Sequence, residues 1–244
     1  MKKILIAIIV TLTLFGCSEN KLTRQMPIER KMEIGNEYME LGKYHKAIPY
    51  FTDVVFERNS KHTAEAQMKL GYCYFYQNKF LEARFEYEEL IRLFHDYKDI
   101  NMAYFQIGVC RYNESLPAHY TQEETEKAVT AFETFIEKFP FDEMKKDAIN
   151  YIQKCRYKLL EKRYYNGYAY YKMFDYSAAL MYFDEIAELG NVDELDKMSL
   201  YYSARIYITR KDKENAVSTA GRLTERYPGS KEAEKINQLL QKLK

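Results

Sequence analysis

Cysteine and histidine are the residues of this chain that could act as nucleophiles, redox groups or metal ligands. The sequence of 244 residues holds four of each. The histidines stand singly, with no cysteine or histidine at ligand spacing on a helix face, which argues against a metal site. The sequence also lacks a glycine-rich phosphate loop, a nucleophile elbow and an HExxH pattern. We therefore expect a chain that is not an enzyme and that uses no metal and no cofactor.

Three of the cysteines, Cys73, Cys110 and Cys155, lie far from the N-terminus. An odd number does not predict a disulfide framework, even in an oxidising compartment. Cys73 and Cys110 each follow a glycine by two residues, at corresponding places of a pattern that repeats along the chain. We expect them to be buried small apolar side chains, because helices at repeat spacing usually hold such Cα atoms beyond the roughly 7 Å that a disulfide can bridge. One bond or one reactive thiol is the alternative.

The fourth cysteine, Cys17, closes a segment that is typical of a secretory signal. Lys2 and Lys3 precede an apolar run from Ile4 to Phe15. This run is too short to span a bilayer, since a spanning helix needs about twenty apolar residues. The sequence therefore predicts a signal peptide over residues 1–16.

The residues around the predicted cleavage point carry a more specific signal. Leu14-Phe15-Gly16-Cys17 resembles a bacterial lipobox, in which cleavage before the cysteine leaves it as the acylated N-terminus. The resemblance implies lipidation of Cys17, with palmitate among the acyl chains, and an acylated tether over residues 17–28. The serine after Cys17 favours the outer membrane by the sorting rule of enteric bacteria. The alternative is a plain cleaved signal with a chance cysteine.

The rest of the chain must position any binding surface, and it is a repeat array. A small residue recurs at Gly35, Gly71, Gly108, Gly167 and Ala204. An alanine lies at a corresponding later place in each unit, and an aromatic residue follows that alanine by four in every unit but the last, where Ala220 breaks the pattern. This frame resembles the tetratricopeptide repeat, in which two antiparallel helices cross closely at the small residues. The resemblance implies an all-α fold, an α-solenoid of about five tetratricopeptide-like helix pairs.

The spacing of the repeats predicts how the array is organised. The third unit carries an insertion around Glu114 to Thr121, which we expect to form a loop. Residues Met144 to Glu161 continue a helical pattern into the fourth unit without a breaker, which predicts one long helix. We therefore expect N-terminal repeats 1–3 over residues 29–141. The long connecting helix, repeats 4–5 and a capping helix would occupy residues 142–244.

Repeats of this kind bind peptides in a concave groove that is lined by their first helices. The corresponding positions here are rich in aromatic residues and methionine, which suit extended peptides with apolar side chains. The predicted peptide-binding residues are Met39, Tyr72, Phe75, Tyr76, Phe105 and Tyr112. The alternative is that some of these side chains pack into neighbouring repeats.

The C-terminal repeats offer a second candidate surface. Its predicted partner-binding residues are Tyr164, Tyr168 and Tyr171 on one helical face, and Tyr201 and Arg205 on the next. Two surfaces suggest two partners. The formal net charge of +1 argues against nucleic acid as one of them.

Further motifs narrow the family. They include Leu116 to Gln122 in the insertion and Tyr176 to Ala179 in the fourth repeat. Together with the lipobox they resemble the BamD family, the lipoprotein subunits of the outer-membrane β-barrel assembly machine. The chain departs from that family at Tyr120-Thr121, where an aspartate commonly precedes the glutamine, and at Arg163 and Tyr182. These departures bear on contact details more than on the fold.

The resemblance implies a lipid-anchored scaffold on the periplasmic face of the outer membrane. Repeats 1–3 would engage the C-terminal targeting segment of unfolded outer-membrane proteins, and repeats 4–5 would dock a barrel-forming, BamA-like assembly subunit. Other assembly lipoproteins would be further partners. The alternatives are another tetratricopeptide lipoprotein that coordinates envelope constriction or polysaccharide export, and a membrane-tethered enzyme. The enzyme lacks a nucleophile, base or metal set placed together.

Overall fold

The computed structural model describes residues 26–58 and 61–242, and their regular structure is helical. The predicted signal peptide and Cys17 lie outside the described residues. The described helices are α3 (Ile28–Glu40), α4 (Tyr44–Phe56), α5 (Thr63–Phe75), α6 (Phe80–Leu93), α7 (Ile100–Glu114), α8 (Glu123–Lys138), α9 (Lys145–Lys172), α10 (Tyr176–Glu188), α11 (Glu194–Arg210), α12 (Lys213–Arg226) and α13 (Lys231–Gln241). Among them, none combines the length and the apolar character that a bilayer crossing requires.

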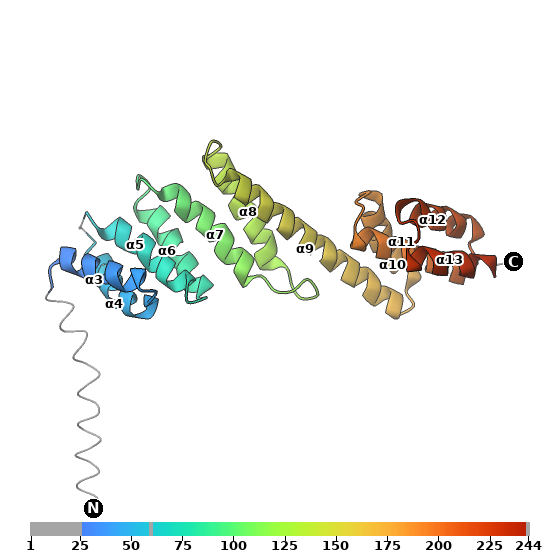
Figure 1. Cartoon of the computed structure of the whole chain (residues 1–244), viewed down its shortest axis with the longest axis horizontal. Coiled ribbons are helices and arrows are strands. Elements are labelled where there is room, and N and C mark those ends of the chain that lie inside the picture. Colours follow the sequence, from blue (N-terminus) through green and yellow to red (C-terminus); the bar gives the residue numbers. More distant parts are fainter. Residues whose placement is uncertain (1–25, 59–60, 243–244) are drawn as a thin grey trace, which may run out of the picture. The chain divides into compact units, whose positions relative to one another are not determined.

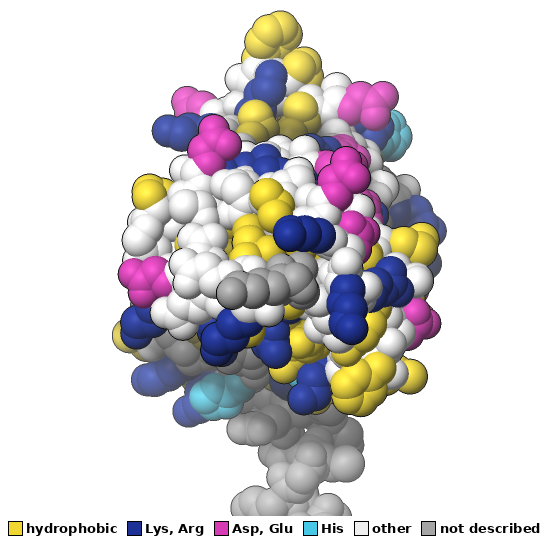
Figure 2. Space-filling model, turned by 90° about the vertical axis from the view of Figure 1, so that its right-hand side faces the viewer, with side chains coloured by type: hydrophobic (Ala, Val, Ile, Leu, Met, Phe, Trp, Pro, Cys, Tyr) yellow, Lys and Arg dark blue, Asp and Glu magenta, His cyan; other side chains and the backbone are white. Residues whose placement is uncertain are grey.

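Successive helices pack as antiparallel pairs (Figure 1). The pairs α3/α4, α5/α6, α7/α8, α9/α10 and α11/α12 each contain one predicted repeat, and α13 packs on α11 and α12 as a cap. The all-α solenoid of about five tetratricopeptide-like pairs is therefore confirmed. Side chains of both charges are scattered over the face seen in Figure 2, in line with the near-zero net charge.

The described chain divides into two compact units. Unit 1 contains the residues up to Glu114 together with Lys127–Ile152, and unit 2 contains Ser115–Glu126 and the chain from Gln153 onward. The division therefore passes through α8 and α9, whereas the sequence analysis placed a boundary between residues 141 and 142. Each unit has its own buried clusters, which are centred on Phe51 and Tyr87 in unit 1 and on Phe183 and Leu200 in unit 2.

One contact recurs inside four of the helix pairs: the glycine of the first helix faces the aromatic ring of the second. A Cβ at Gly71 would lie closer to Cε1 of Tyr87 than real Cβ atoms come to a neighbour. The corresponding pairs are Gly35 with Phe51, Gly108 with Phe132, and Gly167 with Phe183, although at Gly167 the Cβ of Tyr182 is nearer than the ring. All four rings are fully buried. Glycine is therefore required because the ring occupies the space of a side chain.

The fifth pair has alanine at both positions of this contact. Ala220 stands where the other repeats have an aromatic ring, and Ala204 stands where they have glycine. Both alanines are buried in the same cluster, beside Leu200 and Leu223. A methyl group on each helix thus replaces the combination of no side chain and a ring.

The insertion and the long helix form as the sequence predicted. Residues 115–122 make a loop between α7 and α8, and α9 runs unbroken for 28 residues. The Gln122 amide ties the loop together, because its Nε2 donates to the carbonyl oxygens of Pro117 at 2.9 Å and Tyr120 at 3.2 Å. Its Oε1 accepts a hydrogen bond from the Thr125 hydroxyl at 2.7 Å. These bonds give the inserted residues a fixed path within unit 2.

The glycine–ring contact predicts opposite effects for the same substitution at two glycines. Gly71→Ala should lower the free energy of unfolding by about 1 to 3 kcal/mol, because the added methyl meets the Tyr87 ring. Gly221→Ala is the control: it lies in α12 with no atom within 4 Å of the added methyl, and should raise stability by about 0.5 to 1 kcal/mol. Denaturant titrations of both variants would measure this. A Gly71→Ala variant as stable as the parent would contradict the close crossing.

Candidate functional site

The first candidate site is a cavity of about 330 Å³ in unit 1, which we call the methionine cavity. Each of three first helices contributes a thioether to its wall: Met39 from α3, Met68 from α5 and Met102 from α7. Tyr72 and Tyr97 add two aromatic rings. Because thioethers are polarizable and adapt their shape, such a wall can accept apolar side chains of different form. The cavity joins two of the predicted peptide-binding residues, Met39 and Tyr72.

A polar rim surrounds the methionine cavity. Lys69 lies between Glu65 at 2.6 Å and the Asn36 side-chain oxygen at 2.7 Å, so it ties α5 to α3. Lys98, Asp99 and Asn101, which precede or begin α7, complete the rim. This mixture of charges next to thioethers suits a peptide with apolar side chains and a polar backbone.

The two tyrosines of the methionine cavity keep their protons. Burial raises the pKa of Tyr97 to about 12, with a further contribution from the charge of Asp99. Burial also raises the pKa of Tyr72, and the neighbouring Tyr76 adds to the shift. Both phenols are therefore neutral near pH 7 and can donate hydrogen bonds to the carbonyl groups of an extended peptide.

Three of the other predicted peptide-binding residues lie on unit 1 outside the methionine cavity. Tyr76 is 59% exposed at the end of α5 and stacks on Tyr44 of α4, with ring centroids 4.9 Å apart. Phe75 packs edge-on against Tyr76. Tyr112 packs edge-on against Tyr151, with centroids 5.1 Å apart. Since none of the three lines the cavity, the structure does not gather the predicted set into one pocket.

Phe105 does not line the groove surface. Of the two possibilities for the predicted peptide-binding residues, packing against neighbouring helices holds here, because the ring is only 8% exposed. It packs edge-on against Phe132, Phe135 and Tyr151, with centroids 5.5 to 6.1 Å apart. These rings from α8 and α9 cover the side chain, so Phe105 is a core residue of unit 1.

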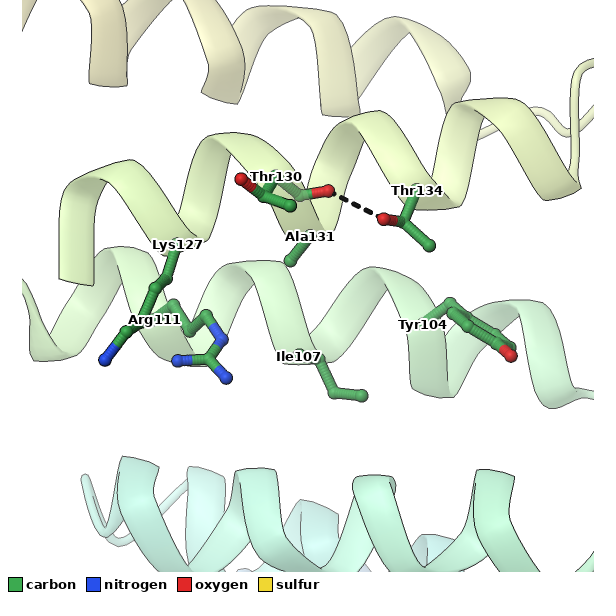
Figure 3. A pocket seen from close by; sticks show the side chains of 7 residues that line it. All are labelled: Tyr104, Ile107, Arg111, Lys127, Thr130, Ala131 and Thr134. Carbon is green, nitrogen blue, oxygen red and sulfur yellow. Dashed lines mark hydrogen bonds between the residues drawn. The ribbon is translucent and has the colours of Figure 1, made fainter. Parts of the chain in front are cut away.

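A second hollow in unit 1 lies between α7 and α8 and has a volume of about 310 Å³ (Figure 3). Ile107 and Ala131 are among its lining residues, and Arg111 and Lys127 lie near each other toward one end. Tyr104 lies at the other end, with Lys138 Nζ 5.4 Å from its ring centroid. The repeat pattern did not predict this hollow, because its groove positions lie on first helices alone.

The second candidate site is a tyrosine cluster in unit 2. Three predicted residues of α9 form a ladder: the rings of Tyr164 and Tyr168 stack with centroids 6.3 Å apart, and so do those of Tyr168 and Tyr171. Tyr202 of α11 packs against this ladder, 4.8 Å from Tyr171 and 5.3 Å from Tyr168. Burial raises the pKa of Tyr202 to about 12, and Tyr168 adds to the shift, so its phenol stays neutral.

Arg205 connects this ladder to Tyr201. Its guanidinium carbon lies 5.7 Å from the ring centroid of Tyr171 and 5.5 Å from that of Tyr201. Both distances are within the range of a cation–π interaction. Tyr201 itself is buried, with only 6% of its surface exposed. The Tyr201 ring is contacted by Arg205, by the neighbouring Tyr202 ring and by Lys235 of α13. Tyr201 is therefore a buried side chain on which Arg205 packs.

The structure thus brings together the five predicted residues of unit 2, and it adds Tyr202, which the sequence analysis missed. The sequence could have indicated Tyr202 only through its position directly after Tyr201 in the same helix. The missed residues of the methionine cavity had a weaker signal. Tyr97, Lys98 and Asp99 lie in the segment before α7, where the repeat pattern assigns no positions.

The cysteine side chains of the described chain lie in its interior. Cys73, Cys110 and Cys155 are buried free thiols, and burial raises the pKa of Cys73 and Cys110 to about 12 and that of Cys155 to about 11. These thiols stay protonated and act as small packing groups. Across the part of the chain that the structure describes, His, Cys, Asp and Glu nowhere form a group of three that could hold a metal ion.

One family model agrees with this fold, since residues 198–230 match the tetratricopeptide repeat. Among solved structures, the chain is similar to the TPR2AB domain of yeast Sti1 in a pHSP90 complex, with a TM-score of 0.48 and 12% identity over 88% of this chain and 83% of that one. It is also similar to the TPR domain of P58(IPK), with a TM-score of 0.44 and 19% identity over 89% of this chain and 56% of that one.

Two further matches concern the family. A curated relative, the outer membrane protein assembly factor BamD of Caulobacter vibrioides, is 21% identical over 231 residues, which cover 92% of this chain and 76% of the relative. Residues 24–189 match the YfiO family, which is described as outer membrane lipoprotein. Because this match covers more than half of the chain, the protein belongs to the YfiO family of outer membrane lipoproteins and is BamD-like.

Proposed function

We propose that this protein is a periplasmic scaffold of outer-membrane β-barrel assembly, held at the outer membrane by acyl chains on Cys17. Unit 1 binds segments of unfolded outer-membrane proteins, and unit 2 docks a barrel-forming, BamA-like assembly subunit. The observation that carries the proposal is the family match over residues 24–189, together with a relative named as an assembly factor. Other assembly lipoproteins are further partners of the scaffold.

The methionine cavity supports the assignment of unit 1. An unfolded barrel protein offers extended segments in which apolar and polar residues alternate. A wall of Met39, Met68 and Met102 accepts the apolar side chains without selecting one shape, while Tyr72 and Tyr97 donate to the peptide backbone. A client that changes from protein to protein is suited to this tolerant kind of site.

The tyrosine cluster supports the assignment of unit 2. Stacked rigid rings present a large apolar area at little conformational cost, and an arginine held between two rings is already ordered before a partner arrives. Tyrosine and arginine are also the residues that dominate protein interfaces. Such a preorganised surface fits a permanent folded partner better than a changing one.

The peptide-binding role predicts a loss of affinity in Tyr72→Ala. The variant should bind a synthetic C-terminal segment of an outer-membrane protein about 1 to 3 kcal/mol more weakly, because a ring is removed from the wall of the methionine cavity. Titration calorimetry would measure the affinity. Phe85→Ala is the control, since this exposed phenylalanine of α6 lies outside the cavity. Equal affinities for Tyr72→Ala and the parent would refute the assignment.

The docking role predicts that Arg205→Gln releases the barrel-forming subunit. Tagged protein purified from crosslinked membranes should recover that subunit with the parent chain, and less of it with the variant, because the cation that bridges Tyr171 and Tyr201 is lost. Arg163→Gln serves as control, since Arg163 pairs with Glu185 at an exposed place in unit 2. Mass spectrometry identifies the recovered proteins. Division or export proteins in place of the barrel would contradict the proposed function.

The anchor predicts that Cys17→Ser abolishes acylation. Cells fed a palmitate analogue should label the parent chain and leave the variant unlabelled, because the acceptor thiol is gone. The variant should also leave the membrane fraction more readily, since firm attachment requires about two acyl chains. A parent chain that carries no label would indicate a plain signal peptide instead.

A further inference from the structure

The turn between α9 and α10 carries an unusual residue for its backbone. Phe174 has a φ angle of +62°, in the left-handed region that residues other than glycine rarely adopt. The same turn position, seven residues after the small residue, is left-handed in three other repeats. There it is occupied by Gly42, Asn78 and Lys211. Glycine and asparagine tolerate this conformation, whereas a bulky aromatic residue is an outlier.

The interior of the protein does not compensate for this strain. The Phe174 side chain is 76% exposed, and that of the preceding Met173 is 72% exposed. The ring of Phe174 meets that of Tyr176 edge-on, with centroids 6.3 Å apart. Folding would be served as well by the asparagine of the second repeat. A strained residue with little burial points to a contact outside the chain.

Basic side chains lie next to this apolar tip. Arg210 reaches it from α11, because its Nη2 donates to the Ser177 hydroxyl at 2.8 Å and its guanidinium carbon lies 5.9 Å from the Tyr176 ring centroid. Lys172 and Lys211 are exposed at the ends of α9 and α11.

The acidic side chains of the same turns are engaged with the backbone. Asp175 accepts a hydrogen bond from the Ala178 N–H at 3.2 Å, and Asp212 accepts one from the Asn215 N–H at 3.2 Å. Each carboxylate thereby caps the helix that follows it. Both carboxylates are thus engaged at helix N-termini, while the side chains of Lys172 and Lys211 are exposed.

We propose that Met173 and Phe174 insert into the surface of a lipid bilayer and that Lys172, Arg210 and Lys211 bind anionic headgroups around them. Apolar side chains at a loop tip enter the boundary between headgroups and acyl chains, and neighbouring cations add attraction to anionic lipid. A bilayer satisfies both features without a matching pocket on a partner. This contact would orient unit 2 at the membrane, which an acyl anchor on Cys17 alone cannot do.

The chain contains no tryptophan, so a single introduced tryptophan reports on its own surroundings. Phe174→Trp in the full-length protein should show a blue-shifted emission on vesicles of phosphatidylethanolamine and phosphatidylglycerol, and quenching by brominated lipid. Phe85→Trp is the matched control, because Phe85 is an exposed phenylalanine of unit 1, 57% accessible. Its emission should stay unshifted. Replacing the anionic lipid with phosphatidylcholine should reduce the shift of Phe174→Trp.

A second reporter covers the case in which Phe174→Trp fails to fold. Met173→Trp should show the same blue shift, and adding Phe174→Asn to it should reduce that shift. Phe174→Asn alone should raise Tm by about 2 to 4 °C, because asparagine relieves the left-handed strain. The proposal is overturned if both reporters emit alike with and without vesicles. It is also overturned if the shift requires another assembly protein, which would make the tip a protein-docking site.

Discussion

The close approach of a glycine to a buried aromatic ring is the constraint on which the rest of this structure depends. In each of the first four helix pairs, the ring of the second helix occupies the space that a side chain on the first helix would need. The contact sets the spacing of the two helices and fixes which face of the first helix is buried. The opposite face of that helix is then free to carry a binding surface. One face of the helix therefore packs in the core, and the other can contact a partner.

The two units use this free face in different ways. In unit 1, the first helices contribute flexible thioethers and a rim in which Lys69 is held by Glu65 and Asn36. In unit 2, α9 and α11 contribute stacked tyrosines with an arginine between two rings. The first kind of surface adapts to what it meets, and the second is ordered in advance. This contrast is the physical basis for assigning a variable client to unit 1 and a constant partner to unit 2.

The sequence predicted the helix pairs and the long α9 because both follow from short-range patterns: small residues at fixed spacing and an apolar period without a breaker. Exposure was less predictable. Phe105 and Tyr201 occupy groove positions of the repeat, but Phe135 and Tyr151 cover the first and Lys235 lies against the second. Phe135 lies in the second helix of the same repeat, Tyr151 in the N-terminal part of α9 and Lys235 in the capping helix α13, and the groove positions of a first helix describe none of these neighbours. The segment from Tyr97 to Asn101 was missed for the same reason.

A residue that is unfavourable for its backbone conformation therefore says more about binding than a residue that suits it. Gly42 and Asn78 suit the left-handed turns in which they lie, so folding alone accounts for them. Folding does not account for Phe174, because the residue adds backbone strain and gains little burial. When local propensity, packing and solvation all favour another residue, the favourable interaction must lie outside the chain. By the same argument, the buried glycines of the repeats concern the fold, and recognition is to be sought where the sequence departs from what the repeat requires.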